Sequence, residues 1–249
     1  MTTARTPLMQ EQRNRTASQI LRSLLHDGPQ GRKRLTAATG RSSTTVTKVI
    51  NELLAAGAVV ESAPTPARSA GRPEVPLDLS PDRILVGIHL YFNRITVSVH
   101  SLRGEELASV VRRHPLSVED SVRHFASIVA GAAELAEELL SDVPGTPVGV
   151  GVATGGGWQG GDHSGANQWR IQEIEDILSP VMSAPVTVDT NVNALALEQH
   201  WWEHIDGDVL TLFVGRSIGI AHMRNDALQM GRFGRGGSID HLIVPGATQ

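Results

Sequence analysis

The sequence contains no cysteine and few aromatic residues: four Trp, four Phe and one Tyr among 249. Without cysteine the chain has neither a disulfide framework nor a thiolate metal site of its own. So few aromatic rings argue against a stacking platform for single-stranded nucleic acid. No apolar run reaches the roughly 18 residues that a membrane span needs, and the N-terminus lacks the apolar core of a signal peptide. We therefore expect a globular chain that works in the cytoplasm.

A net charge of −4 conceals two halves of opposite sign. Residues 1–76 hold eleven Lys and Arg against five acids, a net charge of +6. The remaining residues hold eleven basic and twenty-one acidic side chains, a net charge of −10. Unless this clustering is accidental, the asymmetry predicts a polyanionic partner for the N-terminal part alone.

The basic part has the pattern of three helices and a hairpin. Apolar residues recur at helical spacing in Gln10–His26, and Gly31–Thr39 is a shorter helical stretch. Ser42 or Ser43 caps a third helix that runs to Gly57. Two β-rich runs, 58–61 and 75–79, then flank a segment rich in Pro and Gly. This order predicts an α+β winged helix-turn-helix domain over residues 1–79, with the wing and linker at 58–79.

In such a domain the start of the third helix enters the major groove of DNA. Short hydroxyl side chains and one cation occupy that start and can contact bases and phosphates. Four basic residues surround the second helix, and two arginines lie on the wing, where an arginine arm suits the minor groove. The predicted DNA-binding residues are Ser42, Ser43, Thr44, Thr45, Lys48, Arg32, Lys33, Arg34, Arg41, Arg68 and Arg72. A helical adaptor whose hydroxyls merely cap helices is the alternative.

Residues 80–249 alternate strands with helices, which predicts an α/β domain. β-rich runs occupy 84–90, 94–100 and 106–111, and a long amphipathic helix is predicted over Val118–Leu140. Further strands are predicted at 148–152, 186–189, 209–214 and 220–223, with helices at 171–178 and 193–202.

The order of motifs resembles the ROK family of repressors and sugar kinases. The resemblance rests on 70–73 (Ala-Gly-Arg-Pro), 188–197 (Val-Asp-Thr-Asn-Val-Asn-Ala-Leu-Ala-Leu), 215–220 and 231–242. It implies an actin-like ATPase (ribonuclease H-like) fold for the C-terminal domain, with an incomplete second lobe. It also implies a DNA-binding regulator, a repressor that responds to a sugar or related metabolite and binds its operator as a homodimer or higher oligomer.

The family's catalytic motifs are altered here. Family kinases carry a glycine-rich phosphate loop after the first strand, where this chain has His89-Leu-Tyr-Phe-Asn93. Asn191 stands where the family has its catalytic Asp, and an amide cannot serve as a general base. The resemblance therefore predicts no enzyme, although an active sugar kinase remains a distant alternative.

The family's sugar-binding region corresponds here to Thr154, Gly155, Asn191, Asn193 and His241, which are our candidate effector-binding residues. Thr190 and Ser238 depart from the family pattern, so a ligand-free dimer with a purely structural C-terminal domain is the main alternative. In the family the counterpart of His241 binds zinc together with a cysteine loop. Since the sequence ends before such a loop, we expect a truncated chain, no cofactor in it, and zinc at His241 only in a longer form.

Overall fold

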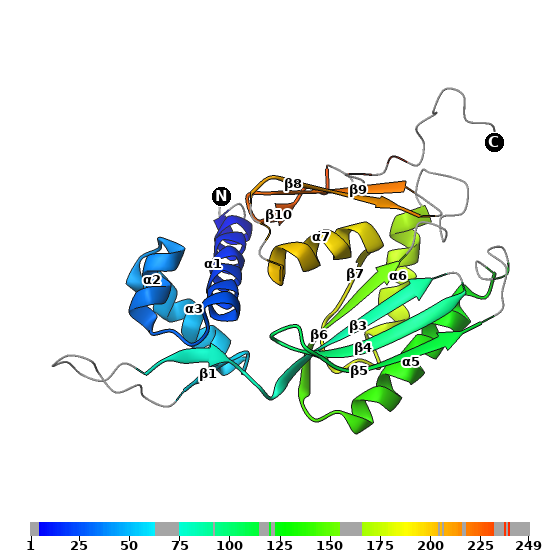
Figure 1. Cartoon of the computed structure of the whole chain (residues 1–249), viewed down its shortest axis with the longest axis horizontal. Coiled ribbons are helices and arrows are strands. Elements are labelled where there is room, and N and C mark those ends of the chain that lie inside the picture. Colours follow the sequence, from blue (N-terminus) through cyan, green and yellow to red (C-terminus); the bar gives the residue numbers. More distant parts are fainter. Residues whose placement is uncertain are drawn as a thin grey trace. The chain divides into compact units, whose positions relative to one another are not determined.

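The computed structural model describes residues 5–62, 75–91, 93–114, 120, 123–154, 166–203, 205, 207–215, 218–231, 237 and 239. The chain divides into two compact units. The first comprises Met1–Arg83 together with Ser101–Glu105, and the second comprises Ile84–His100 and Glu106–Gln249. Figure 1 shows the elements of each unit.

Three helices pack together in the first unit: α1 (Arg5–Asp27), α2 (Arg32–Thr39) and α3 (Ser43–Ala55). Glycines end the first two, since Gly28 and Gly40 adopt positive φ angles of 73° and 61° that other residues avoid. One side of each helix is apolar and contributes to a shared core, to which the hairpin adds three residues. The buried members are Ile20, Leu24, Leu35, Val46, Val49, Ile50, Val59, Leu77 and Leu79.

The predicted hairpin is present as β1 (Val59–Glu61) and β2 (Leu77–Leu79), which pair antiparallel with Val60 opposite Asp78. Two further backbone bonds extend the ladder, from Ser62 N to Pro76 O and from Ser80 N to Ala58 O. The helix starts were less accurate than the hairpin. We predicted Gln10 as the start of the first helix, whereas α1 begins at Arg5.

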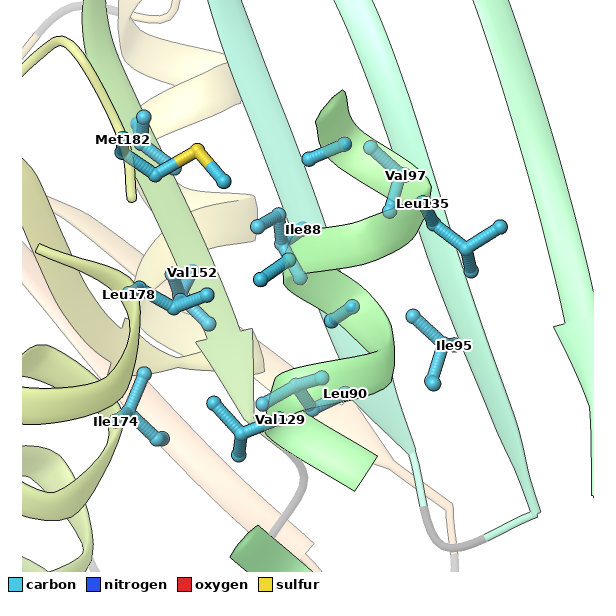
Figure 2. Close-up of a cluster of buried hydrophobic side chains, with 14 of the residues drawn as sticks. Ile88, Leu90, Ile95, Val97, Val129, Leu135, Val152, Ile174, Leu178 and Met182 are labelled. Carbon is cyan, nitrogen blue, oxygen red and sulfur yellow. The ribbon is translucent and has the colours of Figure 1, made fainter. Parts of the chain in front are cut away.

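The second unit is built on a five-stranded sheet of order β5-β4-β3-β6-β7. β4 and β5 pair antiparallel and β6 and β7 pair parallel, so the sheet is mixed. Helices α5 and α6 bury their apolar sides against β3, β4 and β6, and Figure 2 shows this core. The bounds are β3 (Arg83–Tyr91), β4 (Arg94–Ser101), β5 (Glu106–Arg113), α5 (Phe125–Asp142), β6 (Thr146–Thr154), α6 (Ala166–Leu178) and β7 (Val186–Thr190).

A second, three-stranded sheet of order β10-β9-β8 follows helix α7 (Asn191–Trp201). Its strands are β8 (Val209–Val214), β9 (Ile218–Arg224) and β10 (Ala227–Leu228). One side of α7 packs on this sheet through Val192 and Ala196, which meet Ala221 and Met223 of β9. Figure 1 shows α7 between the two sheets of the unit. None of the helices within the described ranges is long and apolar enough to cross a membrane.

We placed the long helix at Val118–Leu140, and α5 runs from Phe125, which is almost fully buried, to Asp142. Asp120 and Arg123 are also helical, and the predicted start at Val118 lies outside the described residues. A hydrophobic stripe locates the buried side of a helix but not its first residue, which depends on local capping. The same reason explains α7, which begins at Asn191 and not at Asn193, because the Thr190 side chain caps it.

Candidate functional site

The start of α3 presents polar side chains to solvent. Ser42 is its N-cap: the Oγ accepts a hydrogen bond from the amide of Thr45 at 3.3 Å and lies 2.9 Å from Thr45 Oγ1. Residues 42–45 and Lys48 are all exposed, while Val46 and Val49 point into the core. The serine cap therefore fixes the first turn of α3 with its hydroxyls outward, which is the arrangement that a groove-reading helix requires.

Two exposed residues of α3 were missed by the sequence analysis. Thr47 and Asn51 lie on the same face as Thr44 and Lys48, because positions three, four and seven apart share a helix face. An asparagine can pair with both edge atoms of adenine in the major groove. The sequence could have indicated them, because they lie on the side of the helix opposite the apolar stripe of Val46, Val49 and Ile50.

Basic side chains surround this face. Lys33, Arg34 and Arg41 are exposed. Arg32 donates to Glu61 of β1 at 3.2 Å, and both side chains are partly exposed. An exposed ion pair of this kind contributes roughly 0–1 kcal/mol, so a phosphate can compete for the arginine. Arg68 and Arg72 lie outside the described residues.

Three of the five candidate effector residues lie at one edge of the five-stranded sheet. Because β6 and β7 are parallel and in register, Thr154 lies opposite Thr190 at their carboxyl ends. Ligands of α/β folds collect at such ends. The structure thus brings Thr154 together with Asn191 and Asn193 of α7, whereas Gly155 and His241 lie outside the described residues.

A hydrogen-bond network connects this edge to α7. Asp189 Oδ1 accepts from the Asn193 side-chain amide at 2.6 Å and from the Thr190 amide at 2.7 Å. Thr190 Oγ1 accepts from the Asn193 backbone amide at 3.3 Å, and Thr154 Oγ1 donates to Asp189 O at 3.4 Å. Asn193 is only 5% exposed. Its amide is thus committed within the protein, and Thr154 and Asn191, both partly exposed, are the side chains better placed to reach a ligand.

The position of the family's phosphate loop is occupied by a strand. β3 continues through His89, Leu90 and Tyr91, and Leu90 is fully buried. His89 Nε2 is buried without a hydrogen-bond partner. Burial lowers the pKa of His89, and the nearby Arg94 charge lowers it further. Residues 89–91 are part of an extended strand and so do not form the turn of backbone amides that cradles a phosphate, while Phe92 lies outside the described residues.

No group of three His, Asp or Glu side chains within the described part of the chain is arranged to hold a metal ion. The candidate residues at the two sites carry hydroxyl, amide and cationic groups, which can recognise polar or anionic partners.

The fold is that of a winged helix-turn-helix unit joined to an α/β unit with the actin-like ATPase fold. It matches a solved structure described as a ROK family transcriptional regulator, homolog of the E. coli MLC protein, with a TM-score of 0.65. The two chains are 19% identical, and the match covers 93% of this chain and 60% of the other. Residues 163–249 match the model of the ROK family.

Two relatives extend the match toward the N-terminus. A xylose repressor of Caldicellulosiruptor bescii is 23% identical over 238 residues, which cover 90% of this chain and 57% of the repressor. A transcriptional regulator of Mycobacterium bovis is 26% identical over 187 residues, which cover 72% of this chain and 41% of the regulator. The chain thus spans about half the length of the curated relatives that it matches.

Proposed function

We propose that this chain is part of a DNA-binding transcription regulator, a repressor whose first unit binds duplex DNA. The observation that carries the proposal is the exposed face of α3, where a capped first turn presents hydroxyls, Lys48 and Asn51 while the opposite face is buried. The net charge of +6 over residues 1–76, from eleven basic and five acidic side chains, favours a polyanion there. The names of its relatives support the same function. We infer that the regulator acts on DNA in the cytoplasm.

The polar and basic groups of such an interface have two roles, contacting phosphates and contacting base edges. Arg34 and Arg41 supply phosphate contacts that position the unit, while Lys48 and Asn51 of α3 reach base edges. A homodimer would present two such helices to half-sites about one helical turn apart. Arg68 and Arg72 of the wing add contacts in the minor groove.

The experiment is selection of duplexes by the purified chain from a random pool, followed by binding titrations near physiological salt. Lys48→Ala should weaken binding of the selected duplex by about 1–3 kcal/mol and relax its sequence preference. Arg113→Ala, an exposed residue of β5 in the second unit, is the matched control and should bind like the wild type. If no duplex is enriched, or if Lys48→Ala binds the selected duplex unchanged, the assignment of α3 to the groove is wrong.

We further propose that the second unit senses a sugar-like effector and does not phosphorylate it. The absence of a glycine cradle at His89 and of a carboxylate at Asn191 supports this reading. The chain incubated with ATP and glucose or N-acetylglucosamine should give no sugar phosphate above background in a coupled assay. Turnover that disappears in an Asn191→Ala variant would contradict it.

One observation favours a ligand-free regulator as the second candidate. The side chain of Asn193, a counterpart of a sugar-holding residue, donates to Asp189 and lies 3.6 Å from Met230 Sδ. Isothermal calorimetry with sugars and phosphosugars separates the two candidates. If a sugar binds the wild type and Thr154→Val or Asn191→Ala abolishes this binding, the chain is a sensor. If none of the sugars or phosphosugars gives a heat of binding, the ligand-free form is supported.

A further inference from the structure

The turn between β4 and β5 belongs to the DNA-binding unit, although both strands belong to the second unit. Residues 101–105 cluster with Met1–Arg83, and the chain leaves them directly into β5. Leu102 packs against the apolar core of the three helices. Arg103, beside it, makes two polar contacts with different elements of the first unit.

The first contact is at the end of α1. Arg103 Nη1 donates to the carbonyl oxygen of Leu25 at 3.4 Å, in the last turn of the helix. Carbonyl oxygens there have no partner inside the helix, and the negative end of the helix dipole attracts a cation. The second contact is with the wing: Arg103 Nη2 donates to Oδ1 of Asp78 at 2.5 Å. One side chain therefore connects the end of α1 to the middle residue of β2.

Gln30 makes an inner connection between the same two elements. Its backbone exchanges two hydrogen bonds with Leu77 of β2, at 2.9 and 2.8 Å. The residue is only 2% exposed, and its side-chain amide donates to the carbonyl oxygen and the hydroxyl of Ser23 in α1. The strand β2 is thus fixed to α1 from inside by Gln30 and from outside by Arg103.

These ties matter because the wing strands are short. β1 and β2 have three residues each, and an isolated two-stranded hairpin is only marginally stable in water. Its orientation on the helices therefore depends on the groups that attach it. Of these two residues, only Arg103 lies in a turn whose flanking strands, β4 and β5, both belong to the sheet of the second unit.

We propose that Arg103 is a positioning residue for the wing, through which the β4–β5 hairpin sets the placement of β2 on α1. The proposal rests on the DNA-binding function proposed above and adds to it a route by which a change in the second unit alters operator binding. A shift of the turn moves the Arg103 guanidinium, and with it Asp78 and the base of the wing. Leu102, packed in the same core, keeps the turn from sliding independently.

Hydrogen exchange of single amides, followed by NMR, tests the tie without DNA. The reporter is the Leu77 amide, which donates to Gln30 O. Arg103→Gln should raise its exchange rate about fivefold, the factor that corresponds to a partly exposed ion pair, with far less effect on amides of α3. Asp78→Asn should act in the same direction. Arg113→Gln, at the other end of β5, is the control and should leave the Leu77 amide unchanged.

A double-variant cycle tests whether a change in the second unit reaches β2 through Arg103. Val97→Ala weakens the core of the second unit, four residues before the turn, where the valine is fully buried. It should speed exchange at Leu77 in the wild-type background and have no further effect beside Arg103→Gln. Ile95→Val is a milder probe at the same core and replaces it if Val97→Ala does not fold. Equal effects in both backgrounds, or no effect in either, would overturn the proposal.

DNA binding provides the second readout. On a duplex selected by the wild type, Arg103→Gln should weaken binding several-fold and reduce the salt dependence, because a displaced wing loses phosphate contacts. Arg103→Lys, which keeps the charge, should restore part of both. Unchanged exchange and unchanged binding in Arg103→Gln would refute the positioning role while leaving the proposed function standing. If the wild type selects no duplex, the proposed DNA-binding function is wrong. The hydrogen-exchange measurements then test the positioning role of Arg103 on their own.

Discussion

At the scale of single residues, His89 is a partly buried histidine in β3. A histidine buried in a strand is tolerated when it stays neutral, because burial penalises the charged form. The pKa of His89 is accordingly lowered by burial and by Arg94, and burial lowers the pKa of His114 as well. In the folded chain both imidazoles therefore favour the neutral form.

This gives a pH dependence of known sign. Above the ordinary histidine pKa of 6.5, both folded and unfolded chains hold neutral His89, and stability does not change. As the pH falls below that value the unfolded chain binds the proton first, so stability declines until the pH passes the lowered pKa of the folded state. Thermal unfolding between pH 5 and pH 8 should therefore show a smaller acid loss for His89→Gln than for the wild type. His114→Gln should change the curve in the same direction, and identical slopes for all three would contradict the assignment.

Residue identity was also the most informative feature of the sequence for the site. The sequence indicated Lys48 as a cation on the third helix and Asn191 in place of a carboxylate, and it offered Ser42 or Ser43 as the cap, of which the structure shows Ser42. The pairing of Asn193 with Asp189, and of Arg32 with Glu61, was not, because such contacts depend on which side chains the fold brings within 4 Å. Sequence spacing places a residue on an element but does not name its partner.

At the scale of elements, the apolar stripes predicted nearly every strand and helix of the chain. The alternating burial along β3, for example, follows directly from Ile84, Val86, Ile88 and Leu90. What the pattern did not contain was the membership of the turn 101–105 in the first unit. That grouping comes from Leu102 and Arg103 reaching elements that lie more than twenty residues earlier in the chain.

The cap of α3 makes a testable claim about one element. Ser42→Ala removes the acceptor for the Thr45 amide and should lower the free energy of unfolding by about 1 kcal/mol. Ser43→Ala is the matched control: it is the first residue of the helix and exposed, so a much smaller loss is expected. Urea denaturation followed by circular dichroism measures both. Equal stability of the two variants would mean that the cap does not hold α3 in place.

At the scale of the whole molecule, apolar and polar surface are unevenly distributed over the second unit. One face of the three-stranded sheet packs on α7, and the other exposes a row that we call the β8 patch: Leu210, Leu212 and Val214 of β8 with Ile218 of β9. The three β8 residues are 65%, 59% and 69% exposed. Ile218 lies opposite Val214 in the ladder, so the row continues onto the next strand. Soluble proteins seldom leave such a contiguous row uncovered.

Among the strands that the structure describes, β8 is at the end of its sheet, and an end strand can offer its backbone groups to another chain. Together these features favour association of chains in concentrated solution. Leu212→Thr introduces a β-branched side chain, which suits a strand, and removes apolar surface. In sedimentation velocity over a range of concentrations, it should shift the chain toward the smaller species without lowering the midpoint of thermal unfolding by more than about 2 °C. Leu107→Thr is the matched control, because Leu107 is also exposed on an end strand, β5, but lies beside charged Glu106. If both variants shift equally toward the smaller species, association depends on general surface hydrophobicity. If Leu212→Thr has no effect, the β8 patch does not take part in association.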